Sequence, residues 1–124
     1  GGETAATLAA LWNSESVAST AKLRESLGET VWVAASVDAV RDPWNDRAPT
    51  IVTLKDAEGS TEMVFWDDVR SELDSELLAP GAVLFLRAQV EEFQGRVQLR
   101  LQDAADMHPV SGKTAEELLA AAGA

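Results

Sequence analysis

The sequence predicts an all-β fold in which five short strands close into a small barrel, with one helix between the third and fourth strands. The main observation is a set of runs between residues 29 and 108 in which apolar and polar residues alternate. A period of two is typical of strands that bury one face. Turn sequences separate the runs, and AEG (57–59) and QG (94–95) are placed as tight hairpins. One helical segment, residues 67–78, falls between the third run and the fourth.

Each strand is expected to point one row of side chains into the barrel and the other row outward, and neighbouring strands are expected to run antiparallel. The expected strands are residues 30–41, 50–56, 60–66 and the two halves of 81–104. The expected interior residues are Val31, Val33, Ala35, Val37, Val52, Leu54, Val64, Trp66, Leu84, Leu86, Ala88, Val90, Val97, Leu99 and Leu101.

The segment between the third and fourth strands predicts a helix over residues 67–78. Its apolar residues Val69, Leu73 and Leu77 recur every fourth position, as on the buried face of a helix. We expect this face to close one end of the barrel. One of the two adjacent aspartates at the start, Asp67 or Asp68, is the expected N-cap.

The two ends of the chain predict short helical additions to the barrel. Ser14 or Ser16 is expected to cap the second of two N-terminal helices, and Gly28 is expected to end it. Thr114, followed three residues later by Glu117, predicts a capping box at the start of a C-terminal helix. The resulting division of the chain is an N-terminal helical extension over 1–28, the barrel over 29–108, and a short C-terminal helix or tail over 109–124.

Four segments of the barrel region resemble the OB-fold of nucleic-acid-binding proteins, in particular the anticodon-binding and single-strand-binding type. They are LKDAEGS (54–60), FWDD (65–68), PG (80–81) and FQGRVQL (93–99). The resemblance implies a five-stranded Greek-key barrel. It also implies that a single strand crosses the face of strands two and three, between the first and last hairpin loops.

On that face, the resemblance implies a mixture of aromatic rings and cations. Rings stack on bases, and Arg and Lys contact phosphates, with little sequence preference. The candidate nucleic-acid-binding residues are Arg41, Trp44, Arg47, Lys55, Phe65, Phe93, Arg96, Gln98 and Arg100. A structural explanation competes with this one: Trp44 folds its loop onto the barrel, Phe93 packs across its hairpin, and the polar side chains only solvate the sheet.

The net charge of −11 argues against nucleic acid, because affinity comes largely from neutralising phosphates. Two function classes therefore stay open. The first is a non-catalytic module that binds single-stranded DNA or RNA, and the second is an OB-fold protein-interaction or scaffold domain of a larger protein. Oligosaccharide binding on the same face is a third possibility, with only Trp44 and Gln98 in its favour.

Trp32 and Phe85 fall on the outward rows of neighbouring strands, so alternation places two rings outside the barrel. We expect the N-terminal helix to cover them through Leu8, Leu11 and Trp12. The alternative is an exposed aromatic patch for a protein partner or for self-association.

No enzymatic activity, metal site or cofactor is expected. His108 is the only histidine, and there is no cysteine, so no nucleophile with a neighbouring base is apparent. No apolar run is long enough to span a bilayer, so no membrane partner is expected. No signal peptide is visible either, and the sequence assigns no compartment.

Overall fold

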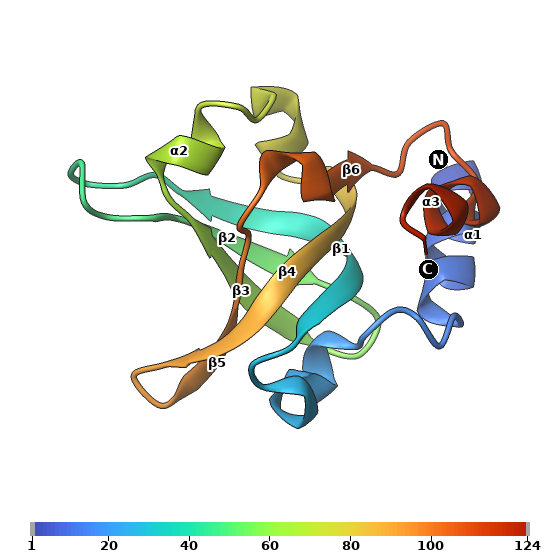
Figure 1. Cartoon of the computed structure of the whole chain (residues 1–124). Helices are drawn as coiled ribbons and strands as arrows, with labels where there is room; N and C mark the ends of the chain where they lie inside the picture. Colours follow the sequence, from blue (N-terminus) through green and yellow to red (C-terminus); the bar gives the residue numbers. More distant parts are fainter. Residues whose placement is uncertain (1, 124) are drawn as a thin grey trace.

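The computed structural model describes residues 2–123 and has a closed ring of five strands at its centre (Figure 1). The ring order is β1-β2-β3-β5-β4, and β4 pairs with β1 to close it. The expected all-β barrel is therefore confirmed. The strands are β1 (Thr30–Arg41), β2 (Thr50–Lys55), β3 (Ser60–Phe65), β4 (Val83–Phe93), β5 (Arg96–Arg100) and an added edge strand, β6 (Met107–Pro109).

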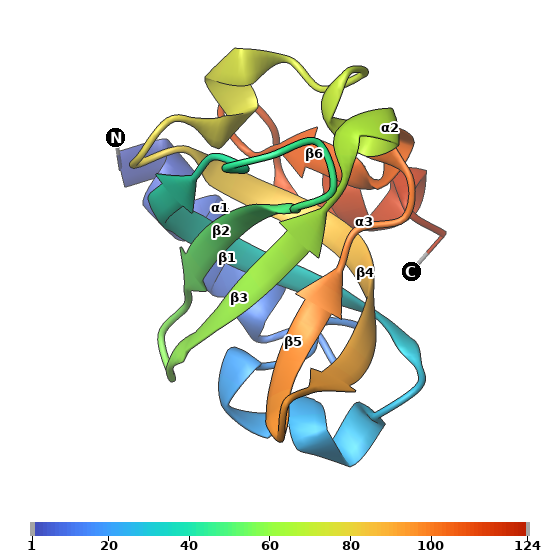
Figure 2. The ribbon, with the colours of Figure 1, turned by 90° about the vertical axis from the view of Figure 1, so that its left-hand side faces the viewer.

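One seam of the ring is parallel, which corrects the expectation that all neighbouring strands run antiparallel. β3 and β5 pair in parallel through only two residue pairs, Met63 with Leu99 and Val64 with Arg100. The reason is parity: strand direction cannot alternate all the way round a ring that has an odd number of strands. Below this short seam, β3 and β5 separate (Figure 2).

The barrel interior holds nearly all of the expected core. Val64 and Trp66 are the exceptions, because β3 lies one residue out of the expected register and turns Met63 and Phe65 inward, both fully buried. The hairpin explains this, since Lys55 pairs with Ser60 and therefore Val52 faces the same side as Met63.

The connector between β3 and β4 is not the continuous helix that was expected. It consists of a single turn, α2 (Asp67–Arg70), and a separate 3₁₀ turn, η2 (Ser75–Leu78). The break occurs because Asp74 is extended and its carboxylate accepts a hydrogen bond from the Glu76 N–H, which starts a new turn. The N-cap of α2 is Trp66, so neither Asp67 nor Asp68 takes that role. Val69 is buried in the main core, and Leu73 and Leu77 pack against it, so the connector still closes this barrel end.

The N-terminal segment contains the helix α1 (Gly2–Trp12) and the 3₁₀ helix η1 (Thr20–Ser26). Ser19 caps η1, so the prediction of Ser14 or Ser16 was wrong; Ser14 instead accepts a hydrogen bond from the Ser16 N–H. Gly28 follows at a positive φ of 85°, which glycine adopts without strain.

A second apolar core lies outside the barrel, on the β1–β4 face. Here α1 and the C-terminal helix α3 (Ala115–Ala121) cover Phe85, which is fully buried, and Trp32, which stacks on it at a centroid distance of 4.6 Å. Thr114 caps α3 as expected, accepting from the Glu117 N–H. Because Phe85 is fully buried, the alternative of an exposed Trp32–Phe85 patch for a partner is wrong. Within residues 2–123, no helix is long and apolar enough to cross a membrane.

Candidate functional site

A groove of about 770 Å³ runs over the outer face of β2, β3 and β5, the face turned toward the viewer in Figure 2. Its floor is apolar at Ile51 and Val64, which are direct cross-strand partners on β2 and β3. The β4–β5 hairpin forms one wall, and η1 forms another beneath the point where β3 and β5 separate. The groove therefore lies on the face that the OB resemblance assigns to single strands.

The wall made by η1 is fastened to the β2–β3 hairpin by Asp56. Its carboxylate accepts hydrogen bonds from the backbone N–H and the hydroxyl of Thr20, both at 2.8 Å. The same carboxylate accepts from the N–H groups of Glu58 and Gly59, so one side chain orders both elements. Leu23 of η1 is buried in the main core and anchors the wall from inside.

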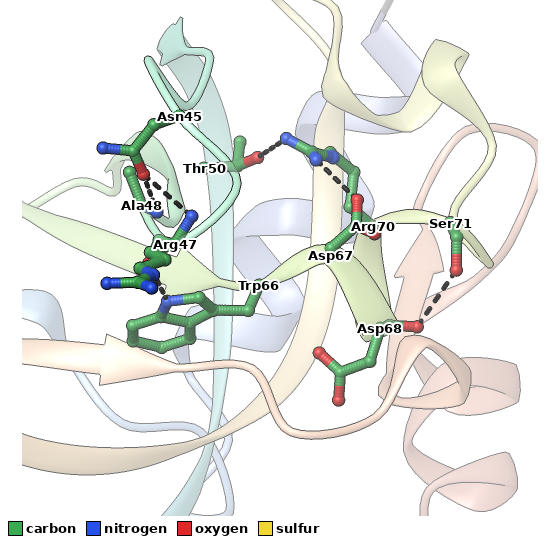
Figure 3. A network of polar contacts seen from close by, with 9 residues as sticks. All are labelled: Asn45, Arg47, Ala48, Thr50, Trp66, Asp67, Asp68, Arg70 and Ser71. Atoms are coloured by element: carbon green, nitrogen blue, oxygen red, sulfur yellow. Dashed lines mark hydrogen bonds and ion pairs between the residues drawn. The ribbon is translucent and has the colours of Figure 1, made fainter.

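Trp66 lies at the upper end of the groove and connects it to the β1–β2 loop (Figure 3). Its Nε1 donates a hydrogen bond to the carbonyl oxygen of Arg47 at 3.1 Å. The loop itself is turned by Asn45, whose Oδ1 accepts from the N–H groups of Arg47 and Ala48. The Arg100 guanidinium lies 4.9 Å from the Trp66 ring centroid, a cation–π contact.

Arg70 holds the start of α2 against the start of β2 (Figure 3). One nitrogen donates to Thr50 Oγ1 at 3.2 Å and another to an Asp67 carboxylate oxygen at 2.6 Å. These contacts fix the backbone on either side of Trp66. The indole is therefore positioned by neighbouring elements and does not depend on its own strand alone.

Two aromatic rings at the ends of this face are open to solvent. Trp44, in the β1–β2 loop, is 87% exposed, and Phe93, in the β4–β5 hairpin, is 56% exposed. The structural explanation for Trp44, that it folds its loop onto the barrel, is therefore wrong. Phe93 also keeps more than half of its surface free, so packing across the hairpin does not account for it.

The cations near the groove divide into paired and unpaired groups. Arg41 lies 3.8 Å from the Glu62 carboxylate, and Lys55 lies 3.3 Å from that of Asp38. Within residues 2–123, Arg47, Arg96 and Arg100 form no ion pair. Of the candidate cations, those three are available to an anionic ligand without breaking an ion pair.

The groove also contains acceptors that carry negative charge. Glu62 projects from the centre of β3, and Glu91 lies at the β4 edge, directly opposite Gln98 on β5. Gln98 Nε2 donates to a Glu91 oxygen at 2.6 Å. Gln98 therefore does line the groove, as predicted, but it is joined to a carboxylate that sequence reasoning had not included.

Four of the nine candidate residues line the groove, namely Arg41, Phe93, Arg96 and Gln98. Trp44, Arg47, Lys55 and Arg100 are outside its lining, and Phe65 does not reach this face. The Phe65 side chain is fully buried in the barrel core, because the side chains of β3 point to the sides of the sheet opposite to those expected. Val64 and Trp66 take the outward positions instead and belong to the groove. The signal that identifies them is the even-numbered hairpin loop, which fixes which β3 residues share a face with Val52 and Leu54.

No protein-family model and no curated protein match this sequence. Solved structures do match by fold. The OB domain of MM0293 from Methanosarcina mazei has a TM-score of 0.65 at 20% identity, covering 78% of this chain and 85% of that chain. A putative aspartyl-tRNA synthetase from Leishmania major Friedlin has a TM-score of 0.58 at 16% identity, covering 79% of this chain and 21% of that one. A chain of the S. pombe Stn1–Ten1 complex has a TM-score of 0.52 at 17% identity, covering 64% and 57%. Identities this low show the fold alone, and we conclude that this chain has an OB fold.

Proposed function

We propose that the groove over β2, β3 and β5 binds single-stranded nucleic acid. The observation that carries this proposal is a pair of uncovered rings: Phe93, which lines the groove, and Trp44, in the β1–β2 loop that Trp66 of the groove holds through the Arg47 carbonyl. Each base has a face that an aromatic ring can stack on, and one stacked base contributes about 1–3 kcal/mol. The position of the groove on the OB barrel supports the same assignment.

The phosphates would contact the rim. Arg47 lies in the β1–β2 loop, Arg96 is the first residue of β5 at the β4–β5 hairpin, and Arg100 lies over Trp66. Stacking and phosphate contacts of this kind give little sequence preference. A similarity to a tRNA synthetase supports a nucleic-acid ligand as an analogy, since the fold is shared at only 16% identity.

The net charge of −11 predicts weak binding that depends strongly on salt. Three unpaired arginines neutralise few phosphates, and the remaining acids repel the strand at long range. We therefore expect measurable binding at low ionic strength and little at high ionic strength.

The proposed role is binding without catalysis. His108, the only histidine, lies outside the groove and stacks against Trp32 at a centroid distance of 5.9 Å. Burial and the nearby Lys113 lower its pKa, although Asp106 opposes that shift. Its surroundings favour a neutral packing role on the covered face.

A second candidate function is protein interaction through the same face. The acidic charge favours it, and so does the pairing of Arg41 and Lys55 with carboxylates. A similarity to one chain of a two-protein complex supports it by analogy. An exposed tryptophan is also a common centre of a protein interface.

Fluorescence anisotropy separates the two candidates. Labelled single strands of DNA and RNA of about 12 nucleotides are titrated with the protein at low salt. Single-strand binding predicts a saturable rise at about 20 mM salt that weakens steeply toward about 200 mM. No rise with either strand at about 100 μM protein would favour the protein-interaction candidate.

Charge variants locate the contact. Arg96→Ala should flatten the log–log salt dependence by about 0.7, the contribution of one phosphate contact to a single strand. Lys113→Ala removes the same charge beside α3, on the opposite side of the barrel, and is the matched control. Equal slopes for the two variants would mean that Arg96 makes no phosphate contact.

A further inference from the structure

The groove floor is unusual for a site that is proposed to hold a polyanion. Two carboxylates line it, Glu62 on the central strand β3 and Glu91 at the edge formed by β4. A strand that enters the groove must pass both. Because phosphates are repelled by carboxylates, the negative groups of the ligand would be kept toward the rim, where Arg47, Arg96 and Arg100 lie.

These carboxylates keep free hydrogen-bonding capacity. Glu91 uses one oxygen to accept from Gln98, and within residues 2–123 its other oxygen has no hydrogen bond. Among the residues that the structure describes, the Glu62 carboxylate has only the long 3.8 Å contact with Arg41. An ionised carboxylate accepts hydrogen bonds and cannot donate them, so the floor requires donors from its ligand.

DNA and RNA differ in the donors that they offer. The backbone of DNA has no hydrogen-bond donor, whereas each ribose of RNA carries a 2′-hydroxyl. A ribose that faces the floor could donate to Glu62 or Glu91. A deoxyribose there would leave the same carboxylate desolvated and unpaired, which is costly.

We infer that Glu62 and Glu91 make this groove select RNA over DNA, by accepting hydrogen bonds from ribose 2′-hydroxyl groups. This inference rests on the proposed single-strand function and specifies its ligand class. Hydrogen bonds to charged groups are stronger than neutral ones. At a half-exposed site we expect about a fivefold to tenfold preference for RNA.

The direct test compares oligonucleotides that differ only at the 2′ position. Oligouridylate, its 2′-deoxy analogue and its 2′-fluoro analogue of about 12 nucleotides are titrated by anisotropy at low salt. The inference predicts that the 2′-hydroxyl strand binds about fivefold to tenfold more strongly than either analogue. The 2′-fluoro strand keeps an RNA-like sugar without the donor, so equal affinity for the 2′-fluoro and 2′-hydroxyl strands would overturn the inference.

Variants connect the preference to the two carboxylates. The double variant Glu62→Gln with Glu91→Gln should reduce the RNA-to-DNA affinity ratio to below about twofold, because an uncharged amide is a weaker acceptor. The control is Glu3→Gln with Glu116→Gln, which removes the same charge from α1 and α3 and should leave the ratio unchanged. Loss of acidic charge raises affinity for both strands, so the ratio isolates the hydroxyl contact. Thermal melting of both variants establishes that the fold is intact.

The outcomes for the two proposals are distinct. Equal affinity for RNA and DNA would overturn the selectivity and leave the binding function standing. No binding to either strand would overturn both proposals. A preference for RNA that survives in the Glu62→Gln, Glu91→Gln variant would also overturn the inference, since the selectivity would then have another source.

Discussion

Two faces of the barrel carry outward aromatic side chains, and only one of these faces is covered by helices. On the β1–β4 face, Trp32 and Phe85 are covered by α1 and α3, which bring Leu11 and Leu118 onto them. On the β2–β3–β5 face, no helix within residues 2–123 covers Trp66, and Trp44 and Phe93, in the two flanking hairpin regions, remain exposed. The difference shows that apolar residues on the outside of a barrel have two explanations, a second packed layer or a ligand surface.

The charges near the two faces differ as well. Over the covered face, Arg87 lies 5.8 Å from the Trp32 ring centroid and pairs with Asp106 at 3.6 Å. Over the open face, Arg100 lies 4.9 Å from the Trp66 centroid and has no carboxylate partner within residues 2–123. On the covered face the arginine over the ring is therefore paired with a carboxylate, whereas on the open face the arginine is free to pair with a ligand.

The largest expected difference between the faces is in stability. Phe85→Ala should lower the free energy of unfolding by about 3–5 kcal/mol, because it empties a fully buried site. Phe93→Ala should change it by less than about 0.5 kcal/mol, as is usual for exposed positions. Urea denaturation followed by tryptophan fluorescence measures both. Similar losses of unfolding free energy in the two variants would contradict the distinction between a packed face and an open one.

Ligand affinity should show the reverse order. Trp44→Ala should weaken single-strand binding by about 1–3 kcal/mol, the contribution of one stacked base. The melting temperature should be unchanged, since the ring is 87% exposed. Affinity that equals that of the wild type would remove Trp44 from the site, and a large fall in melting temperature would place it in the fold instead.

The smallest effect concerns pH and the covered face. Burial and the nearby Lys113 lower the pKa of His108 below its ordinary value near 6.5, with Asp106 acting in the other direction. The unfolded chain therefore binds the proton more tightly than the folded chain does. The contribution of neutral His108 to the free energy of unfolding is fully present above pH 6.5 and is lost as the pH falls toward the lowered pKa of the folded state. We expect the melting temperature of the wild type to drop more between pH 7.5 and pH 5.5 than that of His108→Asn. Parallel curves would show that His108 does not titrate differently on folding.

Much of the fold follows from the sequence because alternation is clear wherever one face of a strand is polar. In β1 and β4 the inward row was predicted correctly. The β2–β3 and β4–β5 hairpins also turn at the segments that were predicted. Gln94 and Gly95 both have positive φ, at 52° and 78°, as a tight two-residue hairpin requires.

The errors fall where both faces of a strand are apolar. The run Met63 to Trp66 has no polar residue, and the predicted register followed these four apolar residues. Glu62, one position earlier in the same strand, shares a face with Val64 and Trp66 and marks that face as the outer one. The hairpin register could also have decided this, because an even loop places Phe65 on the same face as Val52. The apolar outer positions that caused the error, Val64 and Trp66, are part of the groove.

The connector was mispredicted for a different reason. Its apolar spacing fits a helix, but Ser71 and Asp74 offer local hydrogen bonds that compete with helical ones. The short edge strand β6 carries too little pattern to be recognised, and the parallel seam between β3 and β5 depends on closure of the whole ring. None of these features is encoded by spacing within a single segment.

Amide chemical-shift mapping by NMR tests the contrast between the two faces most directly. The isotope-labelled protein is titrated at low salt with single-stranded oligouridylate. We predict shifts that concentrate on β2, β3 and β5 and on the two flanking loops, including the amides of Val64 and Gln98, with little change at Ala34 or Leu118. Shifts centred on α1 and α3, or no shifts at any residue, would contradict the assignment of the open aromatic face as the binding surface.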